Sequence, residues 1–137
     1  MKINKIMFIK NKSSLYLIAS AMLLASCTAP RIAGTWQITN YETNTGDGQE
    51  IKLANIGSLQ FKKNNTGKKQ INYSVLQNKV EDNNPFKWVG GTESITISGK
   101  GTELNKTWII VEDGKKYQKW KSTDGGSTVQ ILELKKQ

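Results

Sequence analysis

The stretch Ile71-Asn72-Tyr73-Ser74-Val75 decides the fold class, because large apolar and polar side chains alternate along it. Successive side chains of a β-strand point to opposite faces, so this period of two is typical of a strand with one buried and one solvated face. Seven further segments have strand-like patterns: 36–39, 59–62, 86–88, 95–97, 108–111, 117–121 and 129–134. The sequence therefore predicts an all-β domain of about eight strands.

Turn residues separate these segments, as antiparallel strands joined by short connections require. Residues that tolerate positive φ angles are found at Gly46-Asp47-Gly48, Asn64-Asn65-Thr66-Gly67, Asp113-Gly114 and Asp124-Gly125-Gly126. Residues 108–111 are apolar at every position, and we expect this strand to be buried on both faces. Residues 50–56 fit either a short turn of helix or an additional strand.

A sheet of this size has to avoid a long exposed edge. An open sheet would leave unpaired backbone groups along two outer strands, whereas a sheet that closes on itself has no such edges. We therefore expect a small antiparallel up-and-down β-barrel.

The first 26 residues differ in composition from the rest of the chain. Four lysines precede an apolar run at 15–24, and the small residues Ala25 and Ser26 follow it. This order is typical of a secretory signal peptide. The apolar run spans roughly 15 Å as a helix, about half of the hydrocarbon core of a bilayer, so a permanent transmembrane helix is the weaker interpretation.

The segment ends with Leu24-Ala25-Ser26-Cys27, which resembles the lipobox of bacterial lipoproteins. The resemblance implies that the Cys27 thiol receives a diacylglyceryl group and that cleavage occurs just before this cysteine. The alternative is an ordinary signal peptide with a chance cysteine, but Cys27 is the only cysteine of the chain. We therefore expect a signal peptide at 1–26 and a lipidated N-terminus at Cys27.

The expected anchor constrains the location of the domain. Residues 27–33 form a short tether, and the path from Cys27 to Trp36 is at most about 30 Å when fully extended, so the barrel at 34–137 must stay close to the membrane. Thr28 follows the cysteine, so the aspartate that holds some lipoproteins at the inner membrane is absent. We expect an outer-membrane anchor that faces the periplasm.

Lysine doublets account for much of the remaining charge. Removal of the four N-terminal lysines lowers the formal net charge from +9 to +5. The doublets lie at 62–63, 68–69, 115–116 and 135–136. We expect them on solvated faces and strand ends, and the alternative is a contribution to holding the domain against anionic headgroups.

The segment Ile32-Ala33-Gly34-Thr35-Trp36-Gln37-Ile38 opens the domain with a Gly-x-Trp motif. Leu59-Gln60-Phe61 then runs into the turn at 64–67, Trp88 and Trp108 lie on later strands, and the last strand contains Ile131-Leu132-Glu133-Leu134. Together these motifs resemble the lipocalin and calycin superfamily, and more closely the small lipocalin-like domains of bacterial lipoproteins. The resemblance implies that Gly34 and Trp36 pack across the closed end of the barrel.

The resemblance leaves two kinds of barrel interior open. The chain is shorter than the larger lipocalins, and their second and third conserved blocks are not recognisable in it. Eight-stranded barrels either hold one small ligand or are filled by their own side chains. The candidate lining of a ligand cavity is Leu59, Phe61, Ile71, Tyr73, Trp88, Ile97, Trp108 and Ile110.

Composition argues against catalysis. The chain has no histidine and its one cysteine is assigned to the lipid, so the usual general base, a nucleophilic thiol and the commonest metal ligand are missing. Carboxylates and amides at 81–84, with Asp124, offer oxygen ligands for calcium, but the spacing of a dedicated calcium loop is missing. We therefore expect no enzymatic activity, no cofactor and no metal.

Lysine and aromatic residues interleave at 116–121. This pattern is typical either of a surface for a polyanion or sugar, or of the two faces of one strand. Tyr117 and Trp120 have opposite parity and cannot both point inward, so we take them as candidates for a surface interaction.

The sequence supports two functional hypotheses. The first is a membrane-anchored barrel that binds a small hydrophobic or amphipathic ligand at the cell envelope. The second is an envelope interaction or structural protein with a filled barrel, whose outer face contacts another protein or a glycan. We expect no nucleic-acid partner for an exported, anchored protein.

Overall fold

The computed structural model describes residues 31–101, 103–122 and 125–137. All regular secondary structure in these residues is β-strand, as the alternating patterns predict. The strands are β1 (Gly34–Asn44), β2 (Glu50–Phe61), β3 (Thr66–Val75), β4 (Asn78–Asp82), β5 (Pro85–Gly90), β6 (Ser94–Gly99), β7 (Thr107–Asp113), β8 (Tyr117–Ser122) and β9 (Val129–Lys136). Among the described residues, no helix is long and apolar enough to cross a membrane.

Eight of the strands form a closed antiparallel barrel, so the predicted fold class is confirmed. They follow one another in the order β2-β1-β9-β8-β7-β6-β5-β3, and β2 then pairs with β3 to close the ring. The closing contact is short, because it joins only residues 57–61 of β2 to residues 67–71 of β3. The complete ring of strand pairs lies within residues 34–136.

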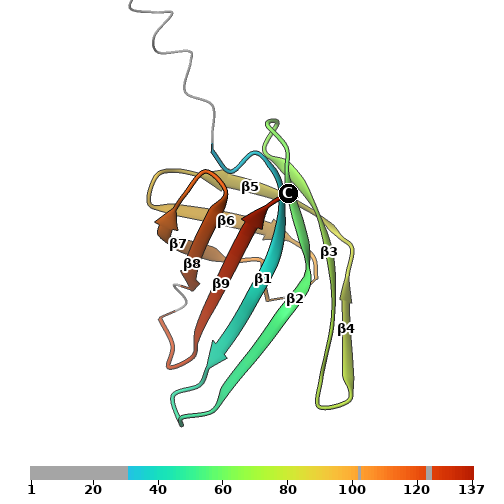
Figure 1. Cartoon of the computed structure of the whole chain (residues 1–137), viewed down its shortest axis with the longest axis vertical. Coiled ribbons are helices and arrows are strands. Elements are labelled where there is room, and N and C mark those ends of the chain that lie inside the picture. Colours follow the sequence, from blue (N-terminus) through green and yellow to red (C-terminus); the bar gives the residue numbers. More distant parts are fainter. Residues whose placement is uncertain (1–30, 102, 123–124) are drawn as a thin grey trace, which may run out of the picture.

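β4 is a ninth strand outside the ring. β3 pairs with β5 over residues 66–68 and with β4 over residues 71–75, so β4 continues the line of β5 along the same edge of β3. Below the closing contact, residues 50–54 of β2 pair with β1, and residues 72–75 of β3 pair with β4. The β1–β2 and β3–β4 hairpins therefore diverge, as Figure 1 shows.

The structure resolves one open alternative, adds one strand and corrects one prediction of strand detail. Residues 50–56 form no helix and belong to β2. β4 was not among the predicted strands, because Val80 is its only apolar residue. The strand at 108–111 is not buried on both faces, since Ile109 and Val111 are 47% and 53% exposed. Within the part of the chain that the structure describes, no second layer covers the outer face of β7, so these two outward side chains stay in contact with solvent.

Aromatic side chains fill the middle of the barrel. The ring of Phe61 makes edge-to-face contacts with Phe86, Trp88 and Trp120 at centroid distances of 5.2, 5.5 and 6.0 Å. The rings of Trp108 and Trp120 lie 6.5 Å apart. Such pairs are favourable beyond the area that they bury. Apolar residues of inward parity from eight strands complete the core.

The two ends of the barrel differ in their connections. The upper end in Figure 1 is where the described chain begins, and it holds the β2–β3 and β7–β8 turns and the end of β9. The lower end holds the β1–β2 and β3–β4 turns and the β6–β7 loop. We use these two names below.

Candidate functional site

Most of the residues predicted to line a ligand cavity are packed in the core. Six of the eight are fully or almost fully buried: Leu59, Phe61, Ile71, Trp88, Ile97 and Trp108. Tyr73 and Ile110 are partly buried against the same core. Only Trp88 and Ile110 line either of the two cavities described below. The other six candidates line neither cavity, and the aromatic rings around Phe61 pack against one another as the alternative of a filled interior predicts.

Trp36 is fully buried near the upper end. Its indole N–H donates a hydrogen bond of 2.8 Å to the carbonyl of Ile32, and the Lys136 ammonium lies 5.5 Å from the ring centroid. Gly34 adopts a φ of +130°, and a Cβ there would lie 2.9 Å from the Lys136 side chain. Gly34 and Trp36 thus pack with the last residues of β9. Cys27 lies outside the described residues.

A cavity of about 560 Å³ opens beside this packing, between the chain entry and the β5–β6 and β7–β8 connections. We call it the end pocket. It is lined by Arg31, Ile32, Trp88, Gly90, Gly91, Thr92, Ile95, Ile110, Asp113 and Gln118. Trp88, Ile95 and Gln118 are buried and form its inner wall, whereas the side chains of Arg31 and Asp113 are 58% and 38% exposed at its rim.

The rim of the end pocket is held by polar contacts between segments distant in sequence. The Arg31 guanidinium donates a hydrogen bond of 3.1 Å to the carbonyl of Asp113 and lies 3.8 Å from its carboxylate. The buried Gln118 amide donates to the other carboxylate oxygen of Asp113 at 2.6 Å and to the carbonyl of Gly114 at 3.0 Å. These contacts fix the pocket wall on β7 and β8 and leave more than half of the Arg31 side chain exposed.

Trp120 is not a surface residue, and that part of the sequence prediction is wrong. It is fully buried, and its indole N–H donates a hydrogen bond of 3.1 Å to the side-chain amide oxygen of Gln118. Gln118 and Trp120 share the inward parity of β8. Gln118 is a polar residue in a lysine-rich segment, so its burial was not predicted. Its position two residues before Trp120, on the same face of the strand, could have predicted it.

Tyr117 takes the outward parity and is partly buried. Its hydroxyl donates a hydrogen bond of 2.6 Å to the Glu133 carboxylate, which also accepts one of 2.8 Å from the Asn40 amide. The hydrogen bond to Glu133 and burial raise the pKa of Tyr117 to about 12. The same hydrogen bond, with that of Asn40, lowers the pKa of Glu133. Tyr117 therefore ties β8 to β9 and β1 on the outer face.

The lower end is closed by the β6–β7 loop. Leu104 of this loop is buried, and its carbonyl accepts a hydrogen bond of 3.0 Å from the Trp108 indole N–H. The buried Gln130 amide donates to the Tyr41 hydroxyl at 2.9 Å and to the Glu103 carboxylate at 2.7 Å. Hydrogen bonds from Gln130 to Tyr41 and Glu103 thus lie across this end of the barrel.

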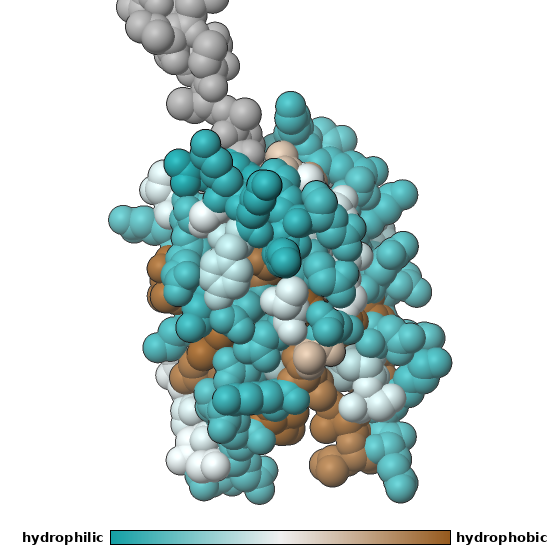
Figure 2. Space-filling view, viewed as in Figure 1, coloured by the Kyte–Doolittle hydropathy of each residue, from teal (hydrophilic) through white to brown (hydrophobic). Residues whose placement is uncertain are grey.

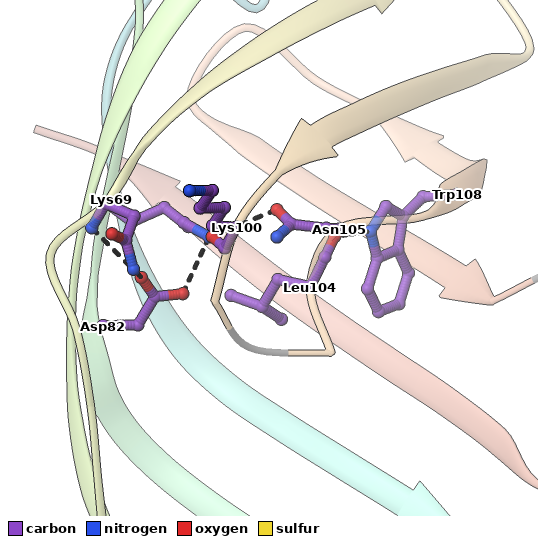
Figure 3. A network of polar contacts seen from close by, with 7 residues as sticks. Lys69, Asp82, Lys100, Leu104, Asn105 and Trp108 are labelled. Carbon is purple, nitrogen blue, oxygen red and sulfur yellow. Dashed lines mark hydrogen bonds and ion pairs between the residues drawn. The ribbon is translucent and has the colours of Figure 1, made fainter.

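A buried ion pair joins the same loop to β3 and β4, as Figure 3 shows. The Lys69 ammonium lies 2.7 Å from the Asp82 carboxylate, and both side chains are almost completely buried. The ammonium also donates to the carbonyl of Lys100 at 2.8 Å and to the Asn105 amide oxygen at 3.2 Å. Asp82, which the sequence offered as a loop carboxylate for calcium, is therefore occupied by Lys69. No cluster of metal-ligating side chains occurs among the described residues, and Asp124 lies outside them.

A second cavity of about 420 Å³ lies on the outer surface of β3, β5 and β6. It is lined by Thr66, Asn84, Pro85, Phe86, Lys87, Ser98, Gly99 and Lys100. Asn84, Pro85, Lys87 and Lys100 are exposed, so this cavity is a surface groove rather than an extension of the barrel interior. The end pocket is the better candidate site because three of its lining side chains are buried, whereas Phe86 alone is buried among the residues that line the groove.

Comparison with known proteins gives similarities of fold. No protein-family model matches the chain, and no curated protein sequence matches it. Among solved structures it is similar to a redesigned β-barrel, at 16% identity and a TM-score of 0.43 over 80% of this chain and 94% of that chain. It is also similar to a de novo designed fluorescence-activating β-barrel, at 13% identity and a TM-score of 0.41 over 80% of this chain and 96% of that chain.

Proposed function

We propose that this protein is a lipid-anchored cell-envelope protein that binds a small amphipathic molecule in the end pocket. The observation that carries the proposal is a cavity of about 560 Å³ with a buried apolar wall and a charged rim. This volume falls in the range of small-molecule sites, which combine mostly apolar walls with a few polar groups that orient the ligand. The absence of histidine from the chain favours binding without catalysis.

The chemistry of the lining suggests the class of ligand. Trp88, Ile95 and Ile110 offer an apolar surface for a hydrocarbon or ring system. Arg31 offers guanidinium N–H donors, whose planar geometry suits a carboxylate or phosphate. Asp113 partly neutralises this guanidinium, so we favour a head group that combines a hydrogen-bond acceptor with a donor over a simple anion.

The expected lipid at Cys27 gives the end pocket a source of such ligands. Cys27 precedes Arg31 by four residues, a path of at most about 14 Å. A lipidated Cys27 would therefore hold the mouth of the pocket close to the bilayer surface. An outer-membrane anchor facing the periplasm is the location that we propose.

Two neighbouring positions on β7 allow a matched test of the pocket. Ile110 lines the pocket, whereas Ile109 points outward and is 47% exposed. Ile110→Trp should fill the cavity and abolish recovery of a bound small molecule, and Ile109→Trp should leave recovery unchanged. Native mass spectrometry of protein purified from its host envelope measures both. A wild-type protein that repeatedly carries no bound molecule would contradict the proposal, provided that unfolding midpoints show both variants to be folded.

The anchor is tested separately. The N-terminal peptide of the protein from its host should begin at Cys27 and carry a diacylglyceryl mass, and Cys27→Ser should move the protein from the membrane to the soluble fraction. A mature N-terminus at any other residue would contradict the anchor without affecting the pocket.

A second candidate function is an envelope interaction through the diverging hairpins at the lower end. Among the described residues, the facing edges of β2 at 50–54 and of β3 at 72–75 pair with no further strand. Unpaired edges bind extended segments of other chains. Leu76 at the tip of the β3–β4 hairpin is 89% exposed, and Figure 2 shows hydrophobic surface on both sides of the notch between the hairpins.

A photo-crosslinking residue distinguishes this second function. Placed at position 76, it should trap one defined envelope protein in cells, while the same residue at the exposed outward position 60 of β2 should trap none. Equal yields of crosslinked products from positions 76 and 60 would indicate random contact and contradict the second function. Trp120 is unsuitable for such a test because it is buried.

A further inference from the structure

Three of the four lysine doublets lie at the upper end of the barrel. Lys62 and Lys63 occupy the β2–β3 turn, Lys115 and Lys116 the β7–β8 turn, and residues 135–136 the end of β9. These segments are far apart in sequence, and only the topology brings them to the end at which the described chain begins (Figure 1).

The doublets occupy one continuous arc of the rim. β2, β1, β9 and β8 are consecutive strands of the barrel, and the backbone N–H of Lys136 donates a hydrogen bond of 2.9 Å to the carbonyl of Lys116. Gly34 pairs with Phe61, and Trp36 pairs with Lys136, so the β2–β3 turn lies beside the start of β1 and the end of β9. We call residues 31–34, 61–66, 114–117 and 134–137 the basic arc. None of these segments contains an aspartate or glutamate side chain.

The lysines of the basic arc differ in their contacts from two lysines of the lower end. Lys52 lies 3.5 Å from Glu42 and 3.3 Å from Glu50, and Lys79 lies 3.1 Å from Glu81. Among the described residues, no carboxylate forms an ion pair with any of the six doublet lysines of the arc. The acidic groups nearest to these segments are Glu93, Glu112 and Asp113, on the side of the end pocket, and Glu133 on β9. Asp113 pairs with Arg31, and Glu133 accepts a hydrogen bond from Tyr117, so neither carboxylate pairs with a doublet lysine. The barrel therefore has a positively charged upper arc and a neutralised lower end.

We infer that the basic arc is a docking surface for anionic lipid headgroups. Unpaired lysines near an anionic leaflet each add about fivefold to membrane partitioning, and several on one face act together. Five of the six are exposed, while Lys136 is half-buried over Trp36. The choice of a lipid surface over another polyanion rests on the proposed anchor at Cys27, which would bring this end of the barrel to the bilayer.

The basic arc attracts the barrel to the membrane and also sets its orientation on the membrane surface. A lipid on Cys27 fixes only the distance of the domain from the bilayer, and the barrel could still rotate about the tether. Contact along β2, β1, β9 and β8 would select one orientation, in which the end pocket, which adjoins the arc at Arg31 and Ile32, lies beside the membrane.

The test uses the chain from residue 27 with Cys27→Ser, which retains the whole ring of strand pairs. It should co-sediment with vesicles that contain phosphatidylglycerol and not with phosphatidylcholine alone, and high salt should release it. Lys115→Gln with Lys116→Gln should lower the partition coefficient about ten- to thirtyfold, as should Lys62→Gln with Lys63→Gln. Lys52→Gln with Lys79→Gln removes the same charge from the lower end and should change it less than about twofold.

Three outcomes would overturn the inference. No binding to phosphatidylglycerol vesicles would do so, as would equal losses in the arc and lower-end variants, since the latter would mean attraction by net charge alone. Retention on an anionic polysaccharide without vesicle binding would assign the arc to a soluble polyanion. Near-ultraviolet circular dichroism confirms that each variant is folded. Because the assay uses unlipidated protein, its failure is distinguishable from failure of the anchor at Cys27.

Discussion

The Lys69 ammonium lies 2.7 Å from the Asp82 carboxylate in the interior, where neither side chain has appreciable contact with solvent. The contact joins β3 to β4, and Lys69 also binds the β6–β7 loop through the Lys100 carbonyl. Two groups that would normally be solvated therefore hold the lower end of the barrel closed.

Lys69→Met should destabilise the fold strongly, because it leaves the Asp82 carboxylate buried without its cation. Losses of about 3–5 kcal/mol are typical when one partner of a buried ion pair is removed. Adding Asp82→Asn should recover much of the loss, since the Asn84 groups that donate to Asp82 can still donate to an amide oxygen. Urea unfolding measures both, and Lys68→Met, on the exposed neighbour, should change stability by less than about 0.5 kcal/mol. If Lys69→Met alone were as stable as Lys68→Met, the ion pair between Lys69 and Asp82 would not be needed for stability.

Tyr117→Phe should destabilise the protein in a pH-dependent manner. The hydroxyl lowers the pKa of Glu133, so its contribution is present above the ordinary glutamate value of 4.5 and is lost as the pH falls through the lower folded pKa. The raised pKa of Tyr117 gives a contribution that is complete below pH 10 and is lost as the pH rises towards about 12. The difference between wild type and variant should therefore be greatest between these limits, at about 1 kcal/mol for a partly solvated hydrogen bond.

Urea titrations across this pH range measure the Tyr117 effect, and Glu133→Gln completes a double-mutant cycle. The coupling between the two residues should vanish when Glu133 is protonated. A loss of stability that does not vary with pH would mean that Tyr117 acts by packing and not through the Glu133 carboxylate.

The inward and outward positions of β3, β5 and β6 could be predicted from sequence, because Ile71, Phe86, Trp88, Ile95 and Ile97 follow a strict period of two. The interior of β8 could not, because a buried glutamine interrupts the apolar pattern. The ninth strand was missed for the same reason, since its inward Asp82 is polar and its charge is paired with Lys69, which is distant in sequence.

The end pocket was missed because its rim depends on tertiary contact. Arg31 and Asp113 meet across 82 positions of sequence, and no local pattern encodes their approach. Ile95 and Ile110 were visible as apolar strand residues, but nothing distinguished a cavity wall from the filled core. The lysine doublets were visible too, whereas their gathering on one arc follows from the order of the strands.

The β3–β4 turn contains removable strain. Leu76 and Gln77 adopt φ angles of 50° and 70°, which tight hairpin turns require and which asparagine and glycine tolerate better. Because the Leu76 side chain is 89% exposed, Leu76→Asn with Gln77→Gly removes no packing. The pair should raise the free energy of unfolding by about 1 kcal/mol. If the second candidate function is correct, the same variant should lose its partner despite being more stable, and lower stability would show that the turn is not strained.

Gly57 controls the closure of the barrel. It lies at the end of the short β2–β3 contact with a φ of +147°, and a Cβ on it would lie 1.9 Å from the carbonyl oxygen of Gln70. Gly57→Ala therefore has to push β3 away at the place where the ring closes, and we expect a loss of more than about 2 kcal/mol. Gly91→Ala is the control, because the nearest atom to its added Cβ would be 3.9 Å away. Hydrogen exchange locates the damage: in Gly57→Ala the amides of 67–71 should exchange faster than those of β8 and β9, where pairing does not depend on closure. Uniform acceleration in all strands would instead mean that the barrel unfolds as one unit and that Gly57 has no special part in closing it.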